Sequence, residues 1–321
     1  MSITRRAALA LPLLATPALA QGGFPSRPIS LLIPFAAGGP TDMIARLLAE
    51  GMQRELGQPV AAENVTGAGG TIAAARVAQA RADGHTLLIH HIGLASAATL
   101  YRQLPFSITQ GLAPLGLVSH TGMVLVARPD FPANDTAGYI RVLRERGEAL
   151  NLGHSGLGGS NQLCAMLLQH AAGKGATQIV FRGSAPAMTE MMAGRLDLSC
   201  EQATVAAPFI RDGRIKGFAV TLPERVTGLD LPTTREGNVD LTMSAWHGLY
   251  ATGGTPPEVV ARLSAAVRAA LGEERLRARY AETLTTLPRA EEVDAAFHAR
   301  FLQSEIERLR PLILAAGQFA D

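Results

Sequence analysis

Residues 31–48 read LLIPFAAGGPTDMIARLL, and this stretch decides the fold of the first part of the chain. An apolar strand runs into a glycine turn, and the turn opens directly onto an amphipathic helix. Such a turn directs several unpaired backbone N–H groups at one point, where the helix dipole favours an anion. The segment therefore predicts a receptor site for a carboxylate or a phosphate that needs no cationic side chain.

The start of the chain has the three parts of an export signal. Arg5 and Arg6 form a positive start, residues 7–14 form an apolar core, and ALA at 18–20 is a small-residue cleavage site. The apolar core is shorter than the roughly 20 residues that a membrane span needs. We therefore expect residues 1–20 to be a cleaved signal peptide and the protein to act in the periplasm. The paired arginines leave both Sec and twin-arginine export open.

The charge of the exported chain excludes several kinds of partner. The 29 basic residues minus the two arginines of the signal leave 27, which equals the 27 acidic residues. A neutral, unpatterned surface attracts neither nucleic acid nor an anionic membrane. With 47% hydrophobic and 17% charged residues, the composition is that of an ordinary globular protein, which we expect to be a monomer.

Cys164 and Cys200 are the two cysteines of the chain. An oxidising compartment permits a bridge between them, yet two cysteines do not make a disulfide scaffold. Both lie among small or apolar neighbours, which favours two buried free thiols.

Strand and helix periodicities alternate along the chain. The predicted strands are Ile29–Phe35, Val60–Asn64, Thr86–His90, Leu150–Gly153, Gln178–Phe181, Leu196–Cys200 and Gly217–Thr221. Leu115–Val118 and Met123–Arg128 together form a long extended stretch, and Thr242–Ala251 forms a further one. The predicted helices are Thr41–Leu56, Thr71–Arg81, Thr136–Arg146, Gln162–Ala172, Pro256–Leu271, Glu274–Glu282 and an interrupted Ala290–Ala315. This order predicts an α/β protein with largely parallel sheets flanked by helices.

A second glycine turn, GLGGS at 156–160, repeats the first one. Each turn follows a strand and leads into a helix through a good N-cap residue, Thr41 or Ser160. Two such units predict the two-lobe (Venus-flytrap) fold of periplasmic binding proteins, with the two helix N-termini facing each other across a cleft. We assign residues 24–120 and 245–321 to the first lobe and residues 121–244 to the second, joined by two hinge crossovers.

The order of further motifs resembles a known family. The motifs are PFAAGGPTD at 34–42, EN at 63–64 with GAGG at 67–70, DGHTLL at 83–88, FRG at 181–183, GRIKGFAVT at 213–221, LPT at 231–233 with EG at 236–237, and WHGL at 246–249. Together they are similar to the periplasmic solute receptors of tripartite tricarboxylate transporters, the Bug-type receptors. The match is collinear over nearly the whole chain after the signal.

This resemblance implies a receptor that captures a small organic acid between its lobes and presents it to membrane permease subunits. In that family, backbone N–H groups and ordered water hold the ligand carboxylate. Asp42 would repel an anion, so we expect it to support the turn by accepting backbone N–H bonds. The predicted ligand-binding residues are Phe35, Ala36, Gly38, Gly39, Thr41, Asp42 and His91 in the first lobe, and Ser155, Gly158, Ser160, Gly183, Ser184 and Glu201 in the second.

Some residues depart from the pattern of the resembling receptors. His90 and His91 end a strand that points at the cleft. A histidine there either donates to a second carboxylate or to an aromatic acid, or is a satisfied, partly buried histidine. Glu201 either recognises an amine or hydroxyl of the ligand or anchors a loop. Asn161 and Gln162 also differ from the usual residues after the second turn.

Enzyme motifs fit this sequence poorly. GHSGL at 153–157 is close to a nucleophile elbow, but Leu157 stands where the final glycine is required. The sequence contains no phosphate-loop, His-Glu-x-x-His or paired-cysteine metal motif, so we expect no cofactor, no metal and no enzyme activity. Two alternatives to a transport receptor remain: a sensor receptor of the same fold, and a secreted hydrolase that uses Ser155.

Overall fold

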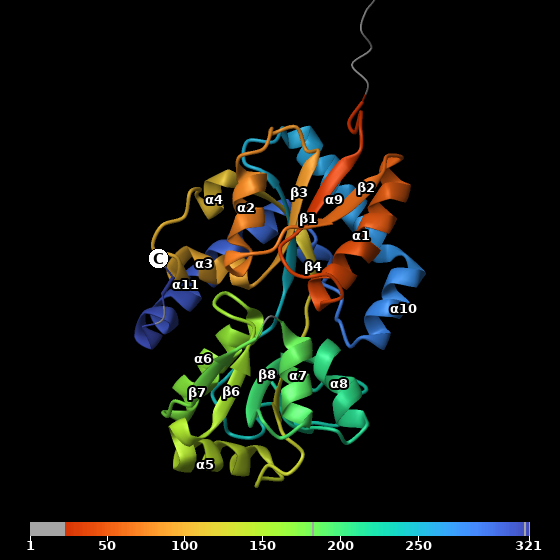
Figure 1. Cartoon of the computed structure of the whole chain (residues 1–321). Helices are drawn as coiled ribbons and strands as arrows, with labels where there is room; N and C mark the ends of the chain where they lie inside the picture. The colour runs from red at the N-terminus through yellow and green to blue at the C-terminus, as the bar shows by residue number, and fades with distance from the viewer. Residues whose placement is uncertain (1–22, 182, 318, 321) are drawn as a thin grey trace, which may run out of the picture.

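The computed structural model describes residues 23–181, 183–317 and 319–320 and consists of two α/β lobes, one above the other in Figure 1. The predicted signal peptide at residues 1–20 lies outside the described residues. Among the residues that are described, no helix is long and apolar enough to cross a membrane.

The sheet of the first lobe has the strand order β2-β1-β3-β10-β4. Strands β1, β2 and β3 run parallel, whereas β10 is antiparallel to both of its neighbours. The strands are β1 (Ile29–Ile33), β2 (Val60–Asn64), β3 (Thr86–His91), β4 (Leu112–Ser119) and β10 (His247–Thr252). The helices of this lobe are α1 (Pro40–Leu56), α2 (Thr71–Ala78), α3 (Gly93–Leu100), α4 (Ile108–Gly111), α9 (Pro257–Gly272), α10 (Glu274–Glu282) and α11 (Ala295–Ala316), with 3-10 turns η1 (Ala68–Gly70) and η3 (Ala290–Glu292).

The sheet of the second lobe repeats this arrangement with the order β7-β6-β8-β5-β9. Here β5 is the reversed strand, antiparallel to β8 and β9. The strands are β5 (Met123–Ala127), β6 (Asn151–His154), β7 (Thr177–Val180), β8 (Leu198–Gln202) and β9 (Lys216–Val220). The helices are α5 (Thr136–Arg146), α6 (Ser160–Ala172), α7 (Ser184–Met192) and α8 (Ala203–Arg211), with η2 (Gly147–Ala149). The predicted class, two lobes each with a largely parallel sheet flanked by helices, is confirmed.

The chain passes between the two sheets twice, from β4 to β5 and from β9 to β10. The two crossovers lie side by side: Gly122 forms a bridge with Ser244, and the N–H of Ala245 donates to the carbonyl of Thr121 at 2.8 Å. The first crossover also pairs with the segment before α11, where His120 and Thr286 exchange two backbone hydrogen bonds.

The apolar core has one part that is continuous between the lobes. A cluster of buried side chains runs from α2, α3 and α11 of the first lobe to α5 and α6 of the second, and includes Leu94, Leu309 and Leu163. In Figure 1, α6 lies below α3 and α11. The lobes are therefore in apolar contact on this side of the molecule, beside the crossovers.

The prediction of two free thiols is wrong. Cys164 and Cys200 form a disulfide, with their Cα atoms 6.0 Å apart. Both residues are fully buried, as their apolar neighbours in the sequence indicated. Apolar neighbours do not distinguish a buried disulfide from two buried thiols.

Candidate functional site

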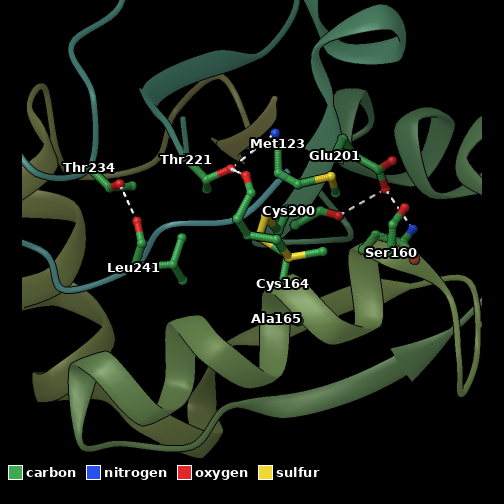
Figure 2. Close-up of a disulfide and its surroundings, with 12 residues drawn as sticks. Met123, Ser160, Cys164, Ala165, Cys200, Glu201, Thr221, Thr234 and Leu241 are labelled. Atoms are coloured by element: carbon green, nitrogen blue, oxygen red, sulfur yellow. Dashed lines mark hydrogen bonds between the residues drawn. A yellow bond between two sulfur atoms is a disulfide. The ribbon is translucent and has the colours of Figure 1, made fainter. Parts of the chain in front are cut away.

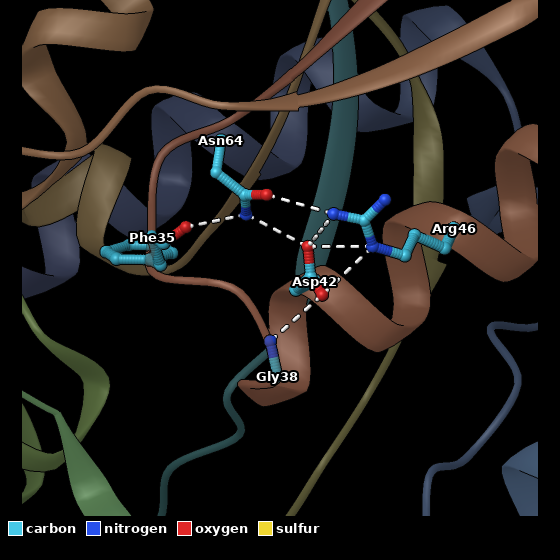
Figure 3. Close-up of polar contacts among 5 residues, drawn as sticks. All are labelled: Phe35, Gly38, Asp42, Arg46 and Asn64. Carbon is cyan, nitrogen blue, oxygen red and sulfur yellow. Dashed lines mark hydrogen bonds and ion pairs between the residues drawn. The ribbon is translucent and has the colours of Figure 1, made fainter.

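The first glycine turn is held by the carboxylate of Asp42, as Figure 3 shows. The N–H of Gly38 donates to Asp42 Oδ2 at 3.0 Å, and Asn64 Nδ2 and Arg46 Nη2 each donate to Oδ1 at 2.9 Å. Asn64 Nδ2 also donates to the carbonyl of Phe35 at 2.9 Å, which ties the start of the turn to β2. Asp42 therefore supports the turn, and the N–H of Gly38 is engaged within the protein.

The folded protein stabilises the ionised form of the Asp42 side chain. Burial alone would raise the pKa of this carboxyl, but the hydrogen bonds from Arg46, Gly38 and Asn64 outweigh burial and hold the pKa below its ordinary value. Among the described residues, no hydrogen bond is made to the N–H groups of Ala36 and Ala37, and both residues are exposed. These two groups, rather than that of Gly38, are available to a ligand on this side.

Replacing Asp42 with asparagine is expected to lower the free energy of unfolding by about 1–3 kcal/mol, because the amide lacks the charge and one of the two acceptor oxygens. Urea unfolding at pH 7 measures this loss. The matched control is Glu63→Gln, which removes an exposed carboxylate paired with Arg76 and should cost less than about 0.5 kcal/mol. Equal losses for the two variants would contradict a supporting role of Asp42.

A cluster of aromatic rings, formed by the half-buried Phe35 and the buried His91 and His247, lies beside this turn. The ring of His91 stacks on Phe35, with centroids 4.4 Å apart and an interplanar angle of 14°. His247, at the start of β10, meets His91 edge-on, with centroids 5.9 Å apart. One nitrogen of His247 bonds the Thr41 hydroxyl at 3.0 Å and the other bonds the Ser119 hydroxyl at 2.9 Å. His247 thus connects the first turn of α1 to the end of β4, at the first crossover.

The hydrogen bond at His91 fixes which ring nitrogen carries the proton. The N–H of Gly93 donates to Nδ1 at 2.8 Å, so Nδ1 is an acceptor and the neutral ring holds its proton on Nε2. Burial, and then the nearby rings of His90 and His247, lower the pKa of His91 well below its ordinary value. His91 is therefore a neutral donor, and no partner for its Nε2 is recorded among the described residues.

The second glycine turn is organised by Asn161. Its Oδ1 accepts from the Ser155 hydroxyl at 2.6 Å, from the Ser155 N–H at 3.1 Å and from the Gln162 N–H at 3.0 Å. Its Nδ2 donates to Glu201 Oε1 at 3.2 Å. Ser160 accepts a bond from Gln202 Nε2 at 3.1 Å. The polar side chains of this turn are therefore engaged with one another and with the end of β8.

Glu201 is 1% exposed and receives three hydrogen bonds. Besides Asn161, Ser184 donates to Oε2 at 2.7 Å and Ser199 donates to Oε1 at 3.0 Å. Burial raises the pKa of Glu201 more than these three donors lower it. The bonds join the turn before α6 to the first residue of α7, so, of the two roles considered for Glu201, this geometry is that of a loop anchor.

Near the second glycine turn, the two lobes contact each other through the backbone of glycine residues. Gly158 of the second turn lies against Gly69 and Gly93 of the first lobe: a Cβ at Gly93 would overlap the carbonyl oxygen of Gly158, and a Cβ at Gly69 would lie 2.6 Å from the carbonyl oxygen of Leu157. Gly39 is the N-cap of α1 in the first lobe, and Gly183 is the N-cap of α7 in the second lobe. Of the predicted residues, Phe35 contacts His91, Gly38 bonds Asp42, and Ser184 bonds Glu201 directly. Ser155 is linked to Glu201 through Asn161.

Sequence reasoning missed several residues that organise this region. His247 entered only as part of the WHGL motif at 246–249, Ser119, Ser199 and Gly93 were not proposed as site residues, and Asn161 was noted only as a departure. Thr41 and His247 are 206 positions apart, so no local spacing could indicate their contact. A polar residue directly after a glycine turn was the one available signal for Asn161.

Two similar α/β lobes, joined by paired crossovers and each with a glycine turn at a helix N-terminus, define a solute-binding protein of the two-lobe type. Residues 44–318 match the family model described as tripartite tricarboxylate transporter family receptor. The chain belongs to this family.

Individual relatives agree with this assignment. A protein of Agrobacterium vitis, described as a UPF0065 protein in the TAR-I ttuE-ttuC' intergenic region, is 38% identical over 305 residues, which cover 94% of this chain and 88% of that protein. The structure of the periplasmic binding protein BugD has a TM-score of 0.86 at 34% identity and covers 93% of this chain and 100% of its own. MatC of Rhodopseudomonas palustris, solved with bound malate, has a TM-score of 0.85 at 35% identity and covers 90% and 100%.

Proposed function

We propose that this protein captures a small organic carboxylate between its two lobes, in the periplasm, and delivers it to the membrane permease subunits of a tripartite transporter. The observation that carries the proposal is that each lobe has a glycine turn at a helix N-terminus, before α1 and before α6, within a chain of the receptor family. Gly158 of the second turn also lies against Gly69 and Gly93 of the first lobe. Malate in the related MatC structure supports a carboxylate as the ligand class. Export would use the predicted signal peptide at residues 1–20.

In this proposal the first lobe binds one carboxylate through the N–H groups of Ala36 and Ala37 and the N-terminus of α1. The second lobe contributes the backbone of residues 155–160 and of Gly183, with Asn161 and Glu201 holding these loops in place. His91 supplies a neutral Nε2–H donor, which suits a hydroxyl or a second carboxylate without fixing the charge of the ligand.

A hydrolase that uses Ser155 is not supported by the contacts of that residue. The Ser155 hydroxyl donates to an amide oxygen of Asn161, which is no general base, and the neighbouring His154 accepts a bond from the N–H of Gly156 through Nδ1. A nucleophilic serine needs a base within hydrogen-bond reach of its own hydroxyl. We therefore propose that the chain binds its ligand without transforming it.

A thermal-shift and calorimetry panel of mono-, di- and tricarboxylates tests the proposal. A ligand at a concentration of 100 times its Kd stabilises the folded state by about 2.7 kcal/mol, which raises the Tm by several degrees. We expect a dicarboxylate such as malate or succinate to do so, and the corresponding diamide to have no effect. His91→Ala should reduce the preference for ligands with a second polar group. If no carboxylate in the panel shifts the Tm, the proposed function is wrong.

A further inference from the structure

The disulfide lies close to the second glycine turn: Figure 2 shows it near Ser160, the first residue of α6, and near Glu201. Cys164 is in the second turn of α6, on the same helix face as Ser160, which is four residues earlier. Cys200 is in β8, immediately before Glu201. The bond therefore joins the helix whose N-terminus forms the turn to the strand that carries the buried anchor of the turn.

Helix α6 and strand β8 are also joined by two hydrogen bonds, both between the disulfide and the start of α6. Asn161 Nδ2 donates to Glu201 Oε1 at 3.2 Å, and Gln202 Nε2 donates to Ser160 Oγ at 3.1 Å. Cys200 and Gln202 are two residues apart in an extended strand and so share the face turned toward α6, while Ser199 and Glu201 share the opposite face. Both hydrogen bonds keep their geometry only if α6 neither slides nor rotates relative to β8.

From this arrangement we propose that the Cys164–Cys200 disulfide is a positioning device for ligand recognition. It limits movement of α6 against β8, and in that way keeps Asn161 in contact with both Ser155 and Glu201, so that the second-lobe turn is held in its binding geometry before the ligand arrives. A binding site that is held in place in advance loses less entropy on binding. This inference rests on the proposed carboxylate-binding function. It assigns a role in ligand recognition to a disulfide that does not itself contact the ligand.

The direct test compares the oxidised protein with the same chain refolded in a reducing agent, with thiol labelling to establish the redox state. The two forms differ by one covalent bond and have nearly equal volume. We expect the dithiol form to bind malate, or the best ligand of the panel, roughly tenfold more weakly by calorimetry. Cys164→Ala/Cys200→Ala serves as a second form that cannot re-form the bond, should the dithiol chain fail to fold.

A purely structural disulfide would lower the Tm and leave the Kd unchanged, so a destabilised control is needed. Leu143→Ala removes a fully buried side chain of α5 in the same lobe, and Leu143 takes no part in the hydrogen bonds of Asn161. We expect it to lower the Tm while the Kd at 25 °C stays within twofold of the wild type. An unchanged Kd in the dithiol form would overturn the inference, and so would an equally raised Kd in the control.

A double-mutant cycle tests whether the disulfide affects ligand binding through Asn161. If the disulfide acts by positioning Asn161, then in Asn161→Ala, or in Ser155→Ala if that variant is unstable, loss of the bond should weaken binding by less than twofold. Independent, additive losses would overturn the positioning role. The outcomes remain separable from the proposed function, because failure of the oxidised wild type to bind any carboxylate contradicts the function and not the role of the disulfide.

Discussion

Gly93→Ala is expected to weaken carboxylate binding by about a hundredfold or more, because the added Cβ would prevent the lobes from meeting. Gly93 is the first residue of α3, and a methyl group there would overlap the carbonyl oxygen of Gly158 in the opposite lobe. Both partners of this contact are backbone, so no rotamer change can relieve it. The lobes must separate instead, and a ligand held by both of them loses half of its contacts.

Calorimetry gives the Kd of Gly93→Ala, and small-angle scattering with saturating ligand shows whether the variant stays more extended than the wild type. Gly272→Ala is the matched control, since it lies at the end of a helix where a Cβ would meet nothing within 4 Å. The same Cβ at Gly93 would also approach the ring of His91, within its own lobe. The pair His91→Ala and His91→Ala/Gly93→Ala removes that second contact, and the hundredfold difference should persist between them. Equal affinities would contradict the closing role of this contact.

The parts of the fold that depend on local spacing could be predicted from the sequence. The helix at Thr136–Arg146 was predicted with its observed bounds, and the repeated strand, glycine turn and helix at 31–48 and 150–168 indicated two similar lobes. Asp42 was expected to support its turn because a carboxylate in the first turn of a helix can accept a loop N–H, and its bond to Gly38 spans only four residues.

The parts that depend on long-range contacts could not be predicted. Nothing local in residues 247–252 says that β10 runs against its neighbours, because direction follows from the route of the crossover. Helix α3, over Gly93–Leu100, is rich in small residues whose periodicity is weak, and no helix was predicted there. The Thr41–His247–Ser119 hydrogen bonds join three segments that the sequence keeps far apart.

Acidification is expected to destabilise the protein strongly between pH 7 and pH 5, because several histidines are buried in the neutral form. Burial lowers the pKa of His90 to about 4 and those of His247 and His298 to about 3, and the pKa of His91 is also well below its ordinary value. In the unfolded chain these rings take up a proton near pH 6.5, whereas in the folded protein they stay neutral. The unfolded state therefore binds more protons, and stability falls as the pH decreases through 6.5 toward the folded pKa values.

Each such histidine should cost about 2 kcal/mol between pH 7 and pH 5, so that together they remove several kcal/mol of a typical total of about 5–15 kcal/mol. Glu201 acts in the opposite direction, since its raised pKa favours the folded state as it becomes protonated, but it is a single group against several histidines. Urea unfolding at half-unit pH steps measures the slope. His298→Gln retains a donor for the Tyr250 hydroxyl and removes one titrating ring, so its mean slope between pH 7 and pH 5 should be smaller by about 1 kcal/mol per pH unit. Because the comparison uses slopes, it holds even if the variant is less stable at every pH, and parallel slopes would contradict the neutral state of His298.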